Sequence, residues 1–402
     1  MSNERFLTGC SAAAQAAKMA EVEVICSYPI RPYTAIMMEL AKMVANGELD
    51  AEFVHGEGEH AQLSVVLGAS AAGARAYTGS AGVGVTYAGE LYSPVAGGRY
   101  PLQMAIADRT LDPPGDFGSE HTDAMTFRDQ GWLLGWACSP QEVFDNTLMN
   151  YRIGEDHRVM LPQMVCQDGY FISHIPDKVV LPEMSQVKEF LPPYNPPHPL
   201  HPERPVSHGP QIRPDQGAPM DAQRAAVFLE VPAVIREATA DFNRIFGRKY
   251  DPFIEKHKME DAEIAFFIMG AHSNTCRNTV DELRKKGVKA GMVRLRWVRP
   301  WPTHALAEAF AGVKAVASVE TSTSYGGAMR GGNLVHELRA SLYDLPDKER
   351  PLVTSFMAGL GGETIWLHDF EFMAKKLLNM IAEKRTSRYV YWIGFEAEGG
   401  KK

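Results

Sequence analysis

Three charged side chains follow or precede short apolar segments in a way that suggests chemistry. Arg31 follows the segment EVEVICSYPI, Arg109 follows LQMAIAD, and Glu59 directly precedes the small-residue stretch HAQLSVVLGASAAGAR. A carboxylate at such a strand-to-helix junction can hold or move a proton, although an acid in a first helical turn commonly only offsets the helix dipole. Guanidinium groups bind carboxylates through paired hydrogen bonds, so both arginines are candidate anion-binding residues.

Other candidate motifs are weaker. His55 and His60 lie close together but lack the H-E-x-x-H spacing of a helical metal pair, and we predict no metal site in this chain. Phosphate-loop and G-x-G-x-x-G motifs do not occur, which disfavours a kinase or a nicotinamide dehydrogenase. The glycine clusters YGGAMRGG and GLGGE are interpreted as tight turns.

Composition and charge narrow the class of protein further. The chain has 402 residues, a net charge of -8 and no block of basic residues, so we expect neither nucleic acid nor an anionic membrane as a partner. It shows no secretory leader and no apolar run of about 18 residues, and we expect a cytoplasmic protein. Five cysteines are too few and too scattered for a disulfide framework or for the close spacing that an iron–sulfur cluster requires, and we expect them to be reduced and mostly buried.

Alternating apolar and helical segments predict an α/β protein with two domains. We place the first domain at residues 1–255, with a mainly parallel sheet and a Pro-rich arm at about 190–220. The histidines of that arm are interpreted as solvated rather than metal-bound. A helix is expected over 221–248, kinked or split by Pro232. A smaller α/β domain is expected at 256–402.

Several motifs in a fixed order resemble the pyruvate:ferredoxin oxidoreductase family of thiamine-diphosphate-dependent 2-oxoacid:ferredoxin oxidoreductases, and within it most closely the alpha subunit of oxalate oxidoreductases. The resemblance covers nearly the whole chain. The segments that carry it are Tyr28–Pro32 for the family's YPITP, Glu57–His60 for ESEH with the following Gly68–Arg75, Arg109 after the third apolar strand, EHTDAMTFRDQGW at Glu120–Trp132, and VRLRWVRPWP at Val293–Pro302.

This resemblance implies a pyrimidine-type thiamine-diphosphate-binding domain followed by a transketolase-C-terminal-like domain. Pro29 and Glu59 would bind the cofactor, and Glu59 would be the catalytic carboxylate, bonded to N1' of the aminopyrimidine so that the cofactor can lose its thiazolium proton. The G-D-G motif for diphosphate is missing, so this chain would supply half of a site. A beta-type subunit would hold the diphosphate, Mg²⁺ and a cluster, a gamma/delta-type subunit would hold further [4Fe-4S] clusters, and ferredoxin would accept the electrons.

The sequence departs from the family at Arg31, where the family generally has threonine. An arginine buried in that motif would need an anion, and Arg31 together with Arg109, which matches the family's carboxylate-binding arginine, could hold a dianion from both ends. We therefore predict oxidation of oxalate to two CO₂ without coenzyme A. The alternatives are a pyruvate or other 2-oxoacid:ferredoxin oxidoreductase alpha subunit and a non-catalytic assembly subunit.

A second departure is the loop TLDPPGDFG after Arg109. Asp112 and Asp116 bring acid close to the expected site, and we hypothesise that the loop, with Phe117, moves so that an aspartate approaches after decarboxylation. The alternative is a stiff surface turn made by its prolines and glycine.

Overall fold

The computed structural model describes residues 3–112, 115–209, 211–328 and 331–395, and the chain divides into two units. Unit 1 comprises the chain up to Asp108, Thr126–Pro252 and Val298–Pro300. Unit 2 comprises Arg109–Met125, Phe253–Trp297 and the chain from Trp301 onward. A division of the sequence after residue 255 therefore misses the segment that carries Arg109, which belongs with the C-terminal unit.

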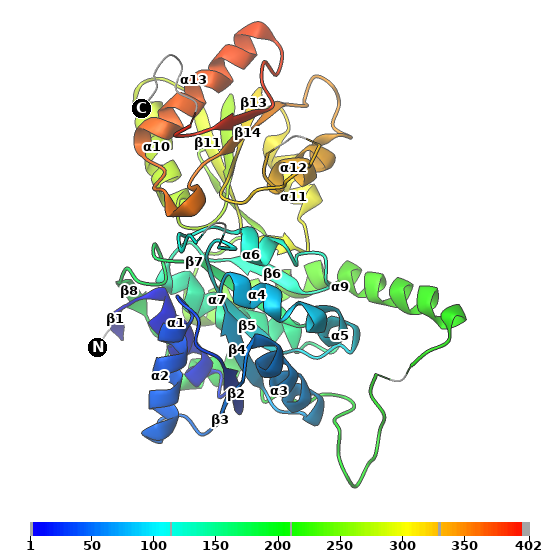
Figure 1. Ribbon diagram of the computed structural model, residues 1–402. Coiled ribbons are helices and arrows are strands. Elements are labelled where there is room, and N and C mark those ends of the chain that lie inside the picture. The colour runs from blue at the N-terminus through cyan, green and yellow to red at the C-terminus, as the bar shows by residue number, and fades with distance from the viewer. Residues whose placement is uncertain (1–2, 113–114, 210, 329–330, 396–402) are drawn as a thin grey trace. The chain divides into compact units, whose positions relative to one another are not determined.

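Unit 1 is built on a seven-stranded sheet in the order β12-β6-β7-β5-β4-β2-β3 (Figure 1). Each pair of neighbouring strands from β6 to β3 along this order is parallel. Strands β4 to β7 are buried at every residue, as a parallel sheet covered on both faces requires. The strands are β2 (Val24–Ser27), β3 (Glu52–His55), β4 (Ala76–Ser80), β5 (Gln103–Asp108), β6 (Leu133–Trp136), β7 (Gln163–Asp168) and β12 (Trp297–Arg299), and β1 (Glu4–Leu7) pairs separately with β8 (Asp177–Val180) in antiparallel.

Small residues allow close helix packing in unit 1. The first helix buries five alanines and packs on α7, which in turn covers β7, whereas α3 packs on β2 and β4. A left-handed Gly73, with φ of 99°, ends α3. The helices are α1 (Gly9–Met19), α2 (Thr34–Ala45), α3 (Glu59–Ala72), α4 (Val83–Tyr87), η1 (Gly89–Leu91), α5 (Tyr92–Gly97), α7 (Pro140–Gly154), α8 (Met184–Phe190) and α9 (Pro214–Phe246).

The predicted helix over 221–248 is present, and it is not split at Pro232. The structure has one helix, α9, that begins earlier, at Pro214, and contains both Pro219 and Pro232. A proline removes only one helical hydrogen bond and adds a local clash. The half of α9 around Pro232 packs on α7 and α8, and its buried side chains offset that cost; they are Val231, Val234, Ile235, Ala238, Thr239 and Phe242.

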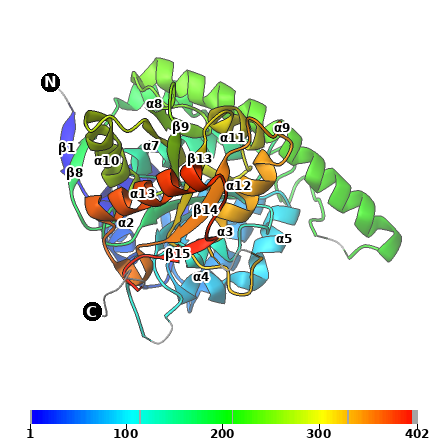
Figure 2. The ribbon, with the colours of Figure 1, turned by 90° about the horizontal axis from the view of Figure 1, so that it is seen from above.

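Unit 2 has a six-stranded sheet in the order β15-β14-β13-β10-β11-β9, in which only β9 runs antiparallel to its neighbour among the described pairs. Helices α10 and α13 pack together on one face of this sheet, and α11 and α12 pack together on the other (Figure 2). Both units are thus α/β with largely parallel sheets, which confirms the predicted fold class. The elements are α6 (Thr122–Met125), β9 (Ile254–His257), β10 (Ile264–Ile268), α10 (Ser273–Lys285), β11 (Ala290–Leu295), α11 (Thr303–Phe310), β13 (Ala315–Glu320), α12 (Leu334–Leu342), β14 (Leu352–Met357), η2 (Leu360–Gly362), α13 (Leu367–Glu383) and β15 (Val390–Trp392).

A fully buried carboxyl group connects two elements of unit 2. Glu320, the last residue of β13, accepts hydrogen bonds from the backbone N–H groups of Leu334 at 2.6 Å and Val335 at 3.1 Å, where α12 begins. The hydroxyls of Ser318 and Ser355 donate to the same carboxyl group at 2.8 and 3.2 Å. Burial nevertheless dominates and raises the pKa of Glu320 from 4.5 to about 7.

This raised pKa predicts that the stability of unit 2 falls with increasing pH. Between pH 4.5 and about 7 the folded state keeps the Glu320 proton that the unfolded state releases, so the free energy of unfolding decreases by up to about 3 kcal/mol across that window and then levels off. Chemical denaturation at pH 4.5 to 8 should show this slope in the wild type relative to Glu320→Gln, which cannot titrate. A constant difference between the two proteins would contradict the prediction.

Candidate active site

Glu59 is positioned by a short turn between β3 and α3. The turn runs through Gly56, Glu57 and Gly58, and α3 begins at Glu59, as the sequence predicted. Glu59 is buried, with 4% of its surface exposed, whereas Glu57 is exposed. A Cβ at Gly58 would lie 2.7 Å from the ring of Tyr87, so a larger residue there would require that ring to shift. The turn therefore directs one carboxylate inward and leaves its neighbour in solvent.

The loop after β4 forms the wall beside Glu59. A side chain at Gly84, in α4, would overlap both the Glu59 carboxylate and the hydroxyl of Ser80. The left-handed φ of 50° at Gly82 turns the chain into α4. Sequence reasoning did not single out Ser80 or Gly84; the available signal was the glycine spacing in SAGVG, directly after a strand.

The end of β2 presents the YPIRP segment at the same edge of the sheet as Glu59, because β2 lies between β3 and β4. Pro29 and Arg31 are exposed, while Tyr33 is fully buried and pairs with the hydroxyl of Ser27 at 2.6 Å. The expectation that Arg31 is buried is therefore wrong for this chain. Its side chain extends from the edge of the sheet instead of into the core, so the chain alone does not desolvate it.

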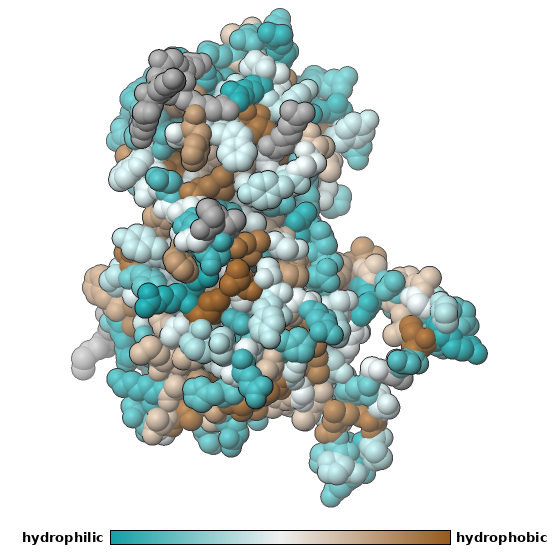
Figure 3. Space-filling model, viewed as in Figure 1, coloured by the Kyte–Doolittle hydropathy of each residue, from teal (hydrophilic) through white to brown (hydrophobic). Residues whose placement is uncertain are grey.

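Exposed apolar and aromatic side chains surround the buried Glu59 carboxylate in unit 1. Tyr28 is 36% exposed, Val83 40% and Tyr87 63%, and apolar residues gather over α4 in the space-filling view (Figure 3). A planar heterocycle with a ring nitrogen could lie on this surface and bond to the carboxylate below. The residues present fit the aminopyrimidine of thiamine diphosphate: one buried acid, a close glycine wall and an apolar rim.

Arg109 lies in unit 2, directly after β5, where the sequence predicted it. It is buried, its backbone N–H donates to the Asp123 carboxylate at 3.1 Å, and its guanidinium lies 4.9 Å from the centre of the Phe117 ring. The Asp112 carboxylate lies 4.0 Å from the same guanidinium. The loop therefore places the Phe117 ring and the Asp112 carboxylate beside the Arg109 guanidinium. Both side chains would lie close to an anion that Arg109 binds.

Hydrogen bonds close the described part of this loop. Thr110 donates from its N–H to the Gly118 carbonyl at 3.0 Å and from its hydroxyl to the Asp116 carbonyl at 2.5 Å. The Asp116 carboxylate accepts from the Gly118 N–H at 2.8 Å. Asp112 has a φ of 66°, a left-handed conformation that Asp adopts more readily than most residues other than glycine. Asp116 thus shapes the loop, while Asp112 lies at a left-handed turn; Pro113 and Pro114 lie outside the described residues.

The loop is attached to the carboxyl edge of the unit 2 sheet. His121, 2% exposed, pairs through Nδ1 with the Thr321 hydroxyl at 2.7 Å and donates from its N–H to the Thr321 carbonyl at 3.0 Å. A side chain at Gly118 would overlap the backbone of Gly361, and Gly361 donates to the Glu120 carboxylate at 3.4 Å. Burial raises the pKa of Glu120. Thr321 and Gly361 therefore position the segment that carries Arg109.

We expect Thr321→Val to reduce kcat/KM about 10-fold, because it removes the hydroxyl that fixes His121 and so loosens the Arg109 segment. Thr321→Ser keeps the hydroxyl and should restore most of the activity. Steady-state kinetics of the two variants in the assembled enzyme test this positioning role. Equal activity of Thr321→Val and wild type would contradict it.

The predicted site residues fall into two groups, one in each unit. Pro29, Arg31 and Glu59 lie together at one edge of the unit 1 sheet, and Arg109 lies with its loop in unit 2.

In the part of the chain that the structure describes, no group of three or more His, Cys, Asp or Glu side chains could hold a metal ion. Within the same residues, no helix has both the length and the apolar character needed to cross a membrane. The cysteines are free, and four of the five are buried, which confirms the prediction.

Two family models match the chain. Residues 15–240 match the thiamine-diphosphate-binding domain of pyruvate flavodoxin/ferredoxin oxidoreductase, and residues 262–370 match core domain II of pyruvate:ferredoxin oxidoreductase. The chain therefore belongs to the pyruvate flavodoxin/ferredoxin oxidoreductase family, whose members are thiamine-diphosphate enzymes.

Relatives within this family align along almost the full chain. Pyruvate synthase subunit PorA of Methanocaldococcus jannaschii is 34% identical over 98% of this chain and 99% of its own, and ketoisovalerate oxidoreductase subunit VorA of Pyrococcus abyssi is 33% identical over 97% of each. Among solved structures, the 2-oxoglutarate:ferredoxin oxidoreductase of Magnetococcus marinus is similar in fold, with a TM-score of 0.70 at 17% identity, covering 94% of this chain and 66% of that one, slightly under two thirds of its length.

Proposed function

We propose that this chain is the alpha subunit of an oxalate oxidoreductase, a complex that oxidises oxalate to two CO₂ without coenzyme A. The reaction is balanced without a further reactant except an electron acceptor: the oxalate dianion loses its carbon–carbon bond and two electrons and yields two molecules of CO₂. We propose that the electrons pass through iron–sulfur clusters in partner subunits to ferredoxin, and that the complex is cytoplasmic.

The observation that carries this proposal is Arg31, a cation in a motif where the family generally has threonine. Arg109 is a second cation, matching the arginine that binds the substrate carboxylate in the family. Oxalate carries a second carboxylate where pyruvate carries a methyl group, so only the dianion would pair with both guanidinium groups. Pyruvate would leave one guanidinium without an anion once the site is closed to water, which disfavours it.

Glu59 is the residue that we assign to proton handling. When bound, thiamine diphosphate supplies a carbon nucleophile and accepts the electron pair released on decarboxylation. Glu59 would hold a proton at N1' of the aminopyrimidine, and its burial keeps water from competing for that hydrogen bond. Pro29, Tyr28 and Tyr87 would orient the ring on the exposed face, and Pro29 is exposed as this contact requires.

Arg109 would orient one carboxylate of oxalate and counter its charge. Its contacts with Phe117 and Asp112 suggest how the loop could contribute. Phe117, 69% exposed, can be displaced at little cost, and Asp112 could then act on the remaining carboxyl group after the first CO₂ has left. Asp116 would keep the loop closed rather than take part in the reaction.

The remaining parts of the site would come from other chains. The described cysteines are free, and four are buried in separate places along the chain, which suits a subunit that holds no cluster. A beta-type subunit would bring the diphosphate and Mg²⁺ site, and a gamma/delta-type subunit would hold further clusters. The relatives PorA and VorA are named as subunits, which is consistent with this division.

For the loop, we expect Asp112→Asn to lower kcat about 10-fold while changing KM little, because the acid would act after the substrate has bound. Asp116→Asn keeps an oxygen that accepts from Gly118 and should have a smaller effect. Single-turnover and steady-state kinetics separate the two steps. Normal turnover of both variants would reject a role for the loop acids.

The substrate is tested by reduction of a low-potential acceptor by the purified anaerobic complex. The assay compares oxalate without coenzyme A to pyruvate with coenzyme A. The proposal is supported if the complex turns over oxalate but not pyruvate. The PorA and VorA relatives favour the alternative that the substrate is a monoanionic 2-oxoacid, and coenzyme-A-dependent pyruvate turnover would establish that alternative.

A further inference from the structure

Unit 1 contains a second pocket, which is lined by the end of α3, the turn between α5 and β5 and the Pro-rich arm, and by none of the residues assigned above. Its volume is about 690 Å³, within the range of small-molecule sites. The α5–β5 turn and the Pro-rich arm form opposite parts of its wall. Its polar and aromatic lining residues are Arg99, Tyr100, His157, Tyr194, His198 and His208. Among the described residues that line it, none is Asp or Glu, so the pocket has cationic and hydrogen-bonding groups without a counter-charge.

Arg99 is the group in this pocket best suited to bind an anion. Its guanidinium donates to the backbone carbonyls of Val159 at 2.8 Å and Arg158 at 3.3 Å, and its buried Nε has no hydrogen-bond partner within the described chain. Within the described residues no carboxylate forms an ion pair with it. Desolvation lowers the pKa of Arg99 from its usual value. A partly exposed cation that contacts backbone carbonyls and has no ion-pair partner among the described residues favours an anion.

The backbone is shaped to place this arginine. Arg99 has a φ of 58°, a conformation that L residues other than Asn and Asp rarely adopt. Side chains at Gly97 and Gly98 would overlap Arg224 and the ring of Tyr100, respectively. The turn Gly97–Tyr100 is therefore tightly built, and its strain is held by the surrounding packing.

The arm supplies a second unused group. His208 pairs through Nε2 with the His198 carbonyl at 2.9 Å, and its buried Nδ1 has no hydrogen-bond partner among the described residues. Its ring lies 5.7 Å from that of Tyr100, centre to centre. His157 fastens the arm from the other side by pairing with the Asn195 carbonyl at 2.9 Å. Arg99, His208 and the ring of Tyr100 thus line one pocket.

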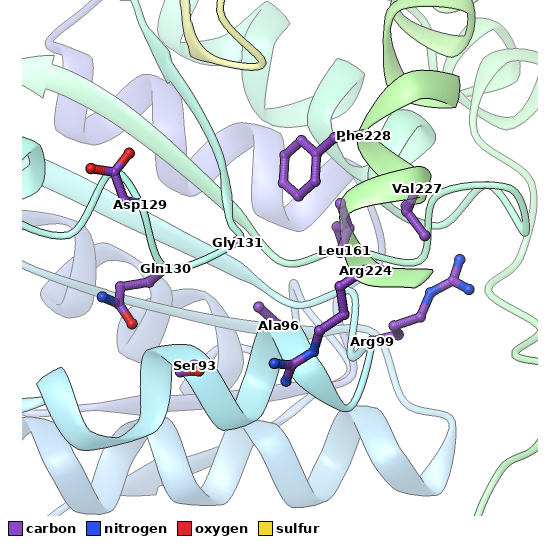
Figure 4. Close-up of a pocket in the computed structure, with 10 residues that line it drawn as sticks. All are labelled: Ser93, Ala96, Arg99, Asp129, Gln130, Gly131, Leu161, Arg224, Val227 and Phe228. Carbon is purple, nitrogen blue, oxygen red and sulfur yellow. The ribbon is translucent and has the colours of Figure 1, made fainter. Parts of the chain in front are cut away.

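The neighbouring pocket, of about 200 Å³, provides a contrast (Figure 4). Arg99 also borders it, together with Arg224 from α9, but Asp129 is part of its wall. The Arg224 guanidinium lies against the end of α5 and pairs with Asp221 at 3.4 Å. One acid therefore lines the smaller pocket, whereas none of the described residues that line the larger pocket is acidic.

We propose that the larger pocket binds a phosphorylated small molecule with a planar ring, of the nucleotide class. The phosphate would accept hydrogen bonds from the partly exposed guanidinium of Arg99 and from the His208 imidazole, because guanidinium and imidazole donors suit phosphate oxygens. The ring would lie against Tyr100 or Tyr194 and the proline rings of the arm, which offer flat apolar surfaces. This site is separate from the catalytic carboxylate and does not depend on the identity of the substrate.

Calorimetric titration of the whole complex with ADP tests the proposal, at saturating thiamine diphosphate and Mg²⁺ so that the cofactor site is filled. Arg99→Gln should weaken ADP binding at least about 10-fold, corresponding to the loss of one charge-assisted contact. His208→Ala should weaken it by a smaller factor. The matched control is Arg158→Gln, since Arg158 lies next to the pocket in an exposed ion pair with Asp156 and Glu237.

Pyrophosphate and adenosine, titrated separately, show which part of the ligand is recognised. Competition by pyrophosphate, lost in Arg99→Gln, is the expected result. Absence of ADP binding by the wild-type complex up to about 1 mM would overturn the proposal, as would binding that neither variant changes. If Arg99→Gln fails to assemble, His208→Ala decides the outcome, because it removes only a side chain of the arm.

Discussion

Replacing Glu59 by glutamine is expected to reduce turnover by about 10²- to 10⁴-fold, the range that a positioned acid–base group contributes. Glutamine fills the same space beside Gly84 and Ser80 but cannot hold a proton in the way a carboxylate does at the ring nitrogen of the cofactor. The loss should therefore appear in kcat. Anaerobic steady-state kinetics and calorimetric titration with thiamine diphosphate measure turnover and cofactor binding separately.

The matched control for this experiment is Glu57→Gln, two residues earlier on the same turn. Glu57 is exposed, whereas Glu59 is buried, so the control removes the same charge without reaching the site. It should keep nearly full activity. If Glu59→Gln were as active as the control in the assembled complex, this chain would be a non-catalytic assembly subunit, and the catalytic carboxylate would have to come from another chain.

The turn around Glu59 could be predicted from the sequence because its signals are local. A short strand segment with Phe53 and Val54, two glycines and a run of small helix-forming residues define a strand, a turn and a helix within about 20 residues, and the helix begins at the predicted residue. The alternation of such segments also predicted the α/β class of both units. These features depend on short-range backbone preferences, which a single sequence contains.

The failures have long-range causes. Pro232 was expected to kink or split its helix; the helix is not split, because packing of α9 on α7 and α8 outweighs the local cost of proline. The contact between His121 and Thr321 joins residues 200 positions apart, and no periodicity reveals such a pair. The assignment of the Arg109 segment to unit 2 has the same origin. Where a loop packs after its strand has ended depends on tertiary contacts, which local sequence patterns do not reveal.

Arg31 was expected to be buried because it stands within a cofactor-site motif, yet it is exposed. The motif determines the course of the backbone after β2, but the surface that would enclose a side chain there can come from another subunit. The exposed fraction of a residue at a shared site is therefore a property of the assembly. This distinction also improves Arg31 as a test position, because a substitution there should leave the fold of the chain intact.

Substitution of Arg31 by threonine, the residue common in the family, is expected to lower kcat/KM for oxalate by roughly 10- to 150-fold. That range corresponds to one charge-assisted contact of about 1.5–3 kcal/mol. The free energy of unfolding should change by less than about 0.5 kcal/mol, since the side chain is exposed. Arg5→Thr, the same change at an exposed residue of β1, is the matched control and should leave oxalate turnover unchanged.

The direction of the change for a monoanion decides what Arg31 contributes. If Arg31 binds the second carboxylate, threonine removes a cation that pyruvate cannot match, so pyruvate turnover should rise while oxalate turnover falls. Arg31→Lys should lie between the two, because lysine keeps the charge but not the paired geometry. A parallel fall for both substrates would instead mean that Arg31 supports the site as a whole, and the choice of oxalate would then have no basis in this residue.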